Sequence, residues 1–167
     1  MNLKTALQTA MEIEAKIRDI YSEALDRCTD DAGRRFFSMM RDDEQYHHDY
    51  LGKRLQELNS SGSIQYLDIK MNIPTSQQIQ DCLKDVRHAI MVEDRGMIQQ
   101  MLSNALATEV VTSQFYEKMV SNSDGQSKKM FARFLEIENG HIAAVQAELD
   151  YVTHSGYWFD FKEFDME

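Results

Sequence analysis

The chain has 167 residues, enough for one domain with a substantial core, and it carries a formal net charge of -10 at pH 7. A negative surface repels phosphate backbones and anionic lipids, so we expect no nucleic-acid partner and no membrane partner. Its two cysteines lie far apart with no second thiol at metal-ligand spacing, which argues against a cysteine-ligated metal centre and against a disulfide framework.

Residues with high helix propensity dominate the sequence, which contains one proline and seven glycines. This composition favours long helices, so we predict an all-α fold. Apolar residues three and four positions apart predict a first helix from residue 3 to about residue 28, and a second helix that ends near Asn59. The turn between them is short, so the two helices of this pair, 3–59, must pack antiparallel.

The second half repeats this plan after a crossover. Residues 60–76 break the periodicity and contain the single proline, which predicts one long crossover connection. A second helix pair is predicted over 77–154, starting with a segment that includes Ile90 and bending near Gly96. The aromatic tail at 155–167 is expected to dock on the bundle or on a second subunit.

Each half contains one Glu-x-x-His motif. Glu44 and His47 form the first, and Glu138 and His141 form the second. Residues three apart lie on one face of a helix, so each carboxylate and imidazole can reach the same metal ion. Five histidines in a chain of this composition should give fewer than one such motif by chance. Two motifs therefore indicate a metal site.

A further glutamate lies upstream of each motif. Glu14 precedes Glu44 by 30 residues and Glu109 precedes Glu138 by 29, so each reaches the height of its motif on the antiparallel helix. Four carboxylates in a core repel one another unless cations neutralise them. We therefore predict a site for two divalent cations. Its metal ligands are Glu14, Glu44, His47, Glu109, Glu138 and His141.

A tyrosine follows each upstream glutamate. Tyr21 comes seven residues after Glu14 and Tyr116 comes seven after Glu109, two turns along the same helix face. Each phenol could hydrogen-bond a ligand carboxylate from a neighbouring helix, or simply fill the core as a buried aromatic.

Two pairs of aspartates are given structural interpretations. We expect Asp30 and Asp31 to cap the second helix, and Asp42 and Asp43 to lie on its solvated face.

The motifs together resemble the rubrerythrin-like branch of the ferritin-like superfamily, in its form without a rubredoxin domain. The resemblance covers nearly the whole chain and includes the tail that begins at Gly156. It implies a ferritin-like four-helix bundle with a di-iron centre, bridged by Glu44 and Glu138, that reacts with peroxide or oxygen. Manganese or zinc could substitute for the two iron ions.

Two features depart from full rubrerythrins. The sequence has no Cys-x-x-Cys to build a rubredoxin centre, so electrons would come from an unknown external donor. Thr112 stands where those proteins carry an extra glutamate.

The predicted function is that of an oxidoreductase acting on peroxide or oxygen. The alternatives are an iron-binding or ferroxidase protein for iron handling or storage, and a bundle that a metal only stabilises. The fifth helix of cage-forming ferritins is not evident, so we expect a homodimer. The amino terminus does not resemble a secretory signal, so we expect a cytoplasmic location.

Overall fold

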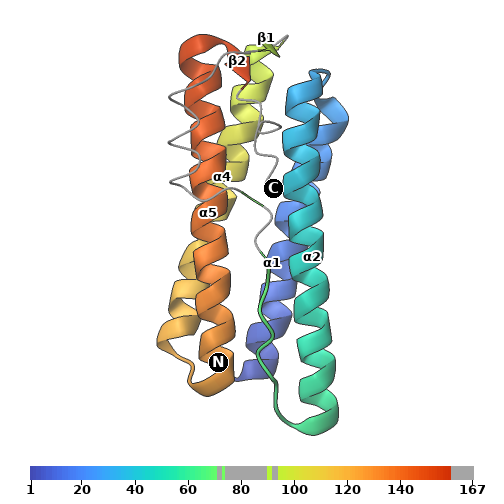
Figure 1. Cartoon of the computed structure of the whole chain (residues 1–167), viewed down its shortest axis with the longest axis vertical. Helices are drawn as coiled ribbons and strands as arrows, with labels where there is room; N and C mark the ends of the chain where they lie inside the picture. The colour runs from blue at the N-terminus through green and yellow to red at the C-terminus, as the bar shows by residue number, and fades with distance from the viewer. Residues whose placement is uncertain (71–72, 74–89, 92–93, 159–167) are drawn as a thin grey trace.

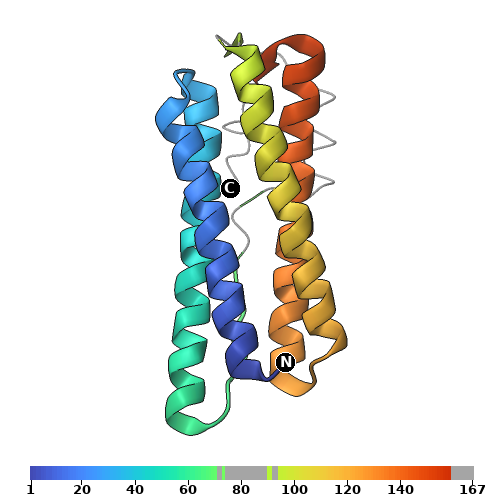
Figure 2. The same ribbon diagram turned by 180° about the vertical axis from the view of Figure 1, so that it is seen from behind.

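The computed structural model describes residues 1–70, 73, 90–91 and 94–158, and four long α-helices run through them. The helices are α1 (Leu3–Arg27), α2 (Asp31–Ser61), α4 (Arg95–Ser121) and α5 (Gly125–Ser155). Figures 1 and 2 show one bundle in which α1 packs beside α2 and α4 packs beside α5. The predicted all-α four-helix bundle is confirmed. None of the described helices combines the length and apolarity needed to cross a membrane.

Polar caps and glycines set the helix ends. The side chains of Asn2 and Asp94 each accept a hydrogen bond from the backbone N–H three residues on, at 2.8 and 3.0 Å, and so begin α1 and α4. Gly62 ends α2 with φ 79°, and Gly156 ends α5 with φ 76°. That left-handed conformation is strained for residues with a side chain, which explains glycine at both positions.

The start of the second helix pair differs from the sequence prediction. α4 begins at Arg95, within the region of the predicted bend. Ile90 is not helical but lies in strand β1 (Ile90–Met91), which pairs antiparallel with strand β2 (Tyr157–Trp158). This pairing joins segments far apart in the sequence, so the local periodicity around Ile90 could not reveal it. The rest of the predicted segment, 77–89, lies outside the described residues.

The crossover chain after α2 runs back along the bundle between α2 and α5 (Figure 1). The hydroxyl of Tyr50 on α2 donates to the Leu67 carbonyl at 2.7 Å. The guanidinium of Arg133 on α5 donates to the Ile69 carbonyl at 3.0 and 3.1 Å. The crossover is therefore attached to both helix pairs.

Trp158 attaches the aromatic tail to the bundle of its own chain. Its side chain is fully buried, and its indole Nε1 donates to the Asp30 carboxylate at 3.2 Å. A Cβ added at Gly33 would come within 2.3 Å of the indole ring, so the start of α2 must carry a glycine there. The tail residues from 159 onward lie outside the described residues.

Two apolar clusters fill the bundle above and below its middle. One contains Phe37 and Trp158, near the turn from α1 to α2. The other contains Phe131 and Leu7, near the turn from α4 to α5. The predicted ligands lie on the helix segments between them.

Candidate metal centre

All six predicted ligands come together in the middle of the bundle. Each helix contributes, and each ligand side chain is 0% exposed. The contributions are Glu14 from α1, Glu44 and His47 from α2, Glu109 from α4, and Glu138 and His141 from α5.

The ligand atoms form two groups that have two carboxylates in common. One group is Glu14, Glu44, His47 and Glu138, and the other is Glu44, Glu109, Glu138 and His141. Within each group, one ligand atom per residue lies within 4.8 Å of the others. Glu44 and Glu138 belong to both groups. Two shared carboxylates, with one glutamate and one histidine at each end, could hold two neighbouring cations.

Both imidazoles direct the same nitrogen at the carboxylates. His47 Nδ1 lies 3.3 Å from Glu44 and 3.5 Å from Glu14. His141 Nδ1 lies 2.7 Å from Glu44 and 3.6 Å from Glu109. The two rings stack, with their centroids 5.4 Å apart. The Nδ1 atoms therefore converge on one cluster of carboxylates from opposite helix pairs.

Several buried ligand atoms lack a hydrogen-bond partner among the described residues. Glu14, Glu109 and Glu138 each have such an oxygen, and both oxygens of Glu138 are in this state. Glu44 Oε1 and His141 Nδ1 also make no aligned hydrogen bond, although they lie 2.7 Å apart as an ion pair. Buried polar atoms without partners cost free energy, as do uncompensated carboxylate charges. Metal ions would satisfy these atoms and neutralise the charges. The oxygen and imidazole donors fit iron, manganese or zinc.

The pKa values show how protons occupy the cluster when cations do not. Burial, followed by repulsion from Glu44, raises the pKa of Glu14 to about 8. Burial, followed by repulsion from Glu14 and Glu44, raises the pKa of Glu138 well above its usual value. Burial would also raise the pKa of Glu44, but attraction to His141 and His47 keeps it well below the usual range. Cations entering the cluster must therefore displace protons.

The two histidines bind protons strongly in the same cluster. Burial by itself lowers the pKa of His47, but the carboxylates of Glu14 and Glu44, which lie 3.5 and 3.3 Å from its Nδ1, raise it to about 10. Burial likewise opposes the charge of His141, whereas Glu44 and Glu109 raise its pKa well above the usual value. Both imidazoles must lose the Nδ1 proton before that atom can bind a metal.

Two tyrosines hold ligand carboxylates across the bundle. The Tyr21 hydroxyl on α1 donates to Glu109 Oε1 on α4 at 2.5 Å, and the Tyr116 hydroxyl on α4 donates to Glu14 Oε1 on α1. Burial, followed by the charge of the accepting glutamate, raises the pKa of each phenol well above its usual value. Both phenols therefore stay protonated, and each helix pair orients the upstream glutamate of the other pair.

The sequence-based prediction for Asp43 is wrong. We expected it on a solvated face with Asp42, yet its side chain is only 1% exposed. Its Oδ2 lies 3.1 Å from His141 Nε2 and 3.8 Å from His47 Nε2. The sequence spacing between Asp43 and His47 could have indicated this contact. Asp43 precedes His47 by four residues, which places both on one helix face.

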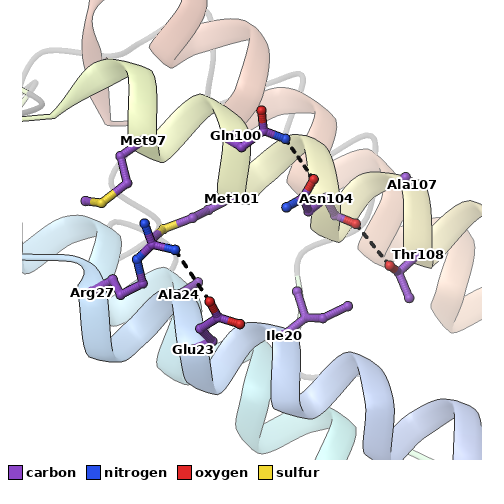
Figure 3. A pocket seen from close by; sticks show the side chains of 10 residues that line it. All are labelled: Ile20, Glu23, Ala24, Arg27, Met97, Gln100, Met101, Asn104, Ala107 and Thr108. Carbon is purple, nitrogen blue, oxygen red and sulfur yellow. Dashed lines mark hydrogen bonds and ion pairs between the residues drawn. The ribbon is translucent and has the colours of Figure 1, made fainter.

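A pocket of about 510 Å³ lies between α1 and α4, outside the ligand cluster (Figure 3). Ile20, Met97 and Met101 contribute its apolar walls. Thr108 also lines it and is the chain neighbour of Glu109. One residue of the pocket wall is therefore adjacent in sequence to a candidate ligand. None of the six candidate ligands lines the pocket, and all six are buried inside the bundle.

Comparisons with protein-family models, with curated proteins and with solved structures found no match to this chain. We therefore infer function from the site itself, a buried group of carboxylates and imidazoles that could hold metal ions.

Proposed function

We propose that this chain is a rubrerythrin-like, non-haem di-iron protein that acts as an oxidoreductase on peroxide or oxygen. The observation that supports this function best is the sharing of Glu44 and Glu138 by two four-residue ligand groups. Carboxylates that reach two ions keep those ions adjacent, as a two-electron reaction at two one-electron metals requires.

Two iron ions in this cage would supply one electron each to peroxide, which takes two electrons and two protons to become two water molecules. The protein prepares the site for that chemistry. Tyr21 and Tyr116 hold Glu109 and Glu14 through hydrogen bonds from their hydroxyls. Ligands held in this way need little rearrangement when a metal binds or changes charge.

The enclosure of the site favours a small oxidant. All six ligands are 0% exposed, and apolar clusters fill the bundle on both sides of them. A bulky substrate could not approach the ligand atoms without opening the bundle, whereas peroxide and oxygen, with two heavy atoms each, would need the smallest opening. A donor other than these 167 residues would return the electrons, because they contain no Cys-x-x-Cys centre.

The test begins with the metal content of protein from iron-replete cells. The ferrous protein is then prepared anaerobically and mixed with peroxide or oxygen, and the remaining ferrous iron is measured. We expect two iron ions per chain and one peroxide consumed for every two ferrous ions. The double variant Glu44→Ala with Glu138→Ala should lose both the iron and the reaction.

A matched control removes two carboxylates that are not ligands. Glu12 and Glu136 are exposed and each lies two residues from a ligand, so Glu12→Ala with Glu136→Ala should leave iron content and reaction unchanged. A native chain without bound metal would overturn the proposal. Bound iron that peroxide and oxygen do not oxidise would show a stabilising metal instead. Iron that is oxidised and then released would show iron handling.

A further inference from the structure

The two helix pairs supply the same ligands but differ in the residue before each Glu-x-x-His motif. Asp43 precedes Glu44, and Ile137 precedes Glu138. Both side chains are buried, so the difference lies inside the bundle. The second pair therefore has a hydrocarbon at the position where the first pair has a carboxylate.

The Asp43 carboxylate faces both imidazoles on the side away from the ligand cluster. Its Oδ2 is 3.1 Å from His141 Nε2, a hydrogen bond that crosses from α2 to α5. The same oxygen is 3.8 Å from His47 Nε2, a nitrogen that lacks a hydrogen-bond partner among the described residues. One carboxylate thus lies within reach of both histidines.

We propose that Asp43 is a shared positioning residue: it accepts the Nε2–H of His141 and, on metal binding, that of His47, which keeps both Nδ1 atoms directed at the metal ions. A neutral imidazole has one donor and one acceptor nitrogen, so a proton held on Nε2 leaves the lone pair on Nδ1. A carboxylate that accepts the N–H of a ligand histidine also fixes the ring orientation.

The same three residues, Asp43, His47 and His141, could in principle bind an ion through Oδ2 and the two Nε2 atoms. That arrangement competes with the proposal, because a neutral imidazole binds one metal ion through one nitrogen. The Nδ1 atoms already face the four glutamates, at distances down to 2.7 Å. We therefore assign Nδ1 to the metal ions and Nε2 to Asp43.

This inference rests on the proposed metal site but not on its redox chemistry, so Zn²⁺ can test it. Protein labelled with ¹⁵N-histidine is loaded with Zn²⁺, and imidazole ¹H–¹⁵N correlations show which nitrogen carries the proton. Zn²⁺ affinity is measured by competition with a chelator. We expect two ions per chain, with a proton on Nε2 and metal on Nδ1 in both His47 and His141.

The Asp43→Asn variant should weaken Zn²⁺ binding by roughly 10- to 100-fold and shift the Nε2–H signals. The effect should be larger at His141 than at His47, because their distances to Oδ2 are 3.1 and 3.8 Å. Asp42→Asn is the matched control, since Asp42 is the exposed neighbour on the same helix and loses the same charge. It should leave affinity and signals unchanged.

Three results would overturn the inference. They are unchanged affinity and imidazole signals in Asp43→Asn, a third Zn²⁺ per chain, and a proton on Nδ1 of either histidine in the loaded wild-type protein. The last result needs no variant, so the test stands even if Asp43→Asn fails to fold. A chain that binds neither Zn²⁺ nor iron would instead overturn the proposed function.

Discussion

The helix pair α1–α2 and the helix pair α4–α5 provide nearly the same chemistry from two segments of different sequence. Each supplies an upstream glutamate, a tyrosine seven residues later and a Glu-x-x-His motif. The pairs differ at Asp43 and Ile137, and only the first has a buried carboxylate there. The ligands thus follow the repeat, whereas the contacts that orient them cross from one pair to the other. Neither pair forms a complete site by itself.

Replacing a shared carboxylate should have the largest effect on this arrangement. Glu44 and Glu138 each belong to both ligand groups, so Glu44→Gln alone, or Glu138→Gln alone, should abolish binding of both ions. Glutamine keeps the size of the side chain but cannot bridge two cations as a carboxylate does. Metal per chain, measured by atomic emission, is expected to fall from two ions to none.

The exposed Glu12 provides a control of the same chemical change, and Glu12→Gln should keep both ions. Circular dichroism would verify that each variant remains helical. If either Glu44→Gln or Glu138→Gln still held two ions, the carboxylate concerned would not be shared between them.

Replacing a glutamate that belongs to only one ligand group should remove one metal ion and leave the other bound. Glu14 belongs to one ligand group and Glu109 to the other, so Glu14→Gln or Glu109→Gln should each leave one ion per chain. The ion left in Glu14→Gln is held with His141, which Asp43 contacts at 3.1 Å. It should therefore bind more tightly than the ion left in Glu109→Gln. Equal affinities in a Zn²⁺ titration would mean that Asp43 does not distinguish the halves.

The gathering of the six candidate ligands could be predicted from the sequence, because a shared metal site requires fixed spacings along each helix. A histidine and a glutamate must lie one helical turn apart, and antiparallel helices carry the upstream glutamates to the same height. The structure places all six of these side chains in one buried cluster.

Asp43 and Ile90 show where local patterns fail. Asp43 is buried because α2 faces more than one neighbour, with α1 on one side and the crossover chain and α5 on another. A prediction from periodicity, which assumes one apolar face per helix, places such a residue on the solvent-exposed face. Ile90 lies in a strand because its backbone pairs with that of Trp158. That partner is too distant in the sequence for local spacing to indicate it. Both outcomes depend on contacts between elements.

The protons held by the cluster should make the metal-free protein sensitive to alkaline pH. The pKa of Glu14 rises from 4.5 to about 8, and that of His47 rises from 6.5 to about 10. Both groups bind protons more tightly in the folded state, so their stabilisation is complete below pH 4.5 and 6.5 respectively. It is lost as pH rises through about 8 and about 10. The opposite shift of Glu44 acts only in acid, because its stabilisation is lost as pH falls.

Thermal unfolding between roughly pH 5 and 10 would measure this effect with and without Zn²⁺. The melting temperature of the metal-free protein should fall with rising pH, and that of the Zn²⁺-bound protein should change less because cations replace the protons. Metal binding should release protons at neutral pH, detectable with a pH indicator in weak buffer. A metal-free protein that became more stable towards pH 10 would contradict the assigned shifts.

Removing a tyrosine hydroxyl should give the smallest loss of metal affinity. The loss should occur at the metal position of the other helix pair, because each tyrosine donates to a glutamate of that pair. Tyr21→Phe removes the donor to Glu109, and Tyr116→Phe removes the donor to Glu14. Loss of a hydrogen bond to a metal ligand typically weakens binding by about 10-fold or more. Each change should therefore weaken the ion position of the opposite helix pair.

Tyr50→Phe is the matched control, because its hydroxyl donates to the Leu67 carbonyl of the crossover and not to a ligand. Zn²⁺ titration of Tyr21→Phe and of Tyr116→Phe, each combined with Glu14→Gln or Glu109→Gln, would assign the effect to one position. In Glu14→Gln, where the ion remains with Glu109, only Tyr21→Phe should weaken binding. If Tyr116→Phe weakened that ion instead, each tyrosine would act within its own helix pair and the two pairs would be independent half-sites. The expected result would mean that a change in one pair alters the metal position of the other, so the two halves must be matched to each other.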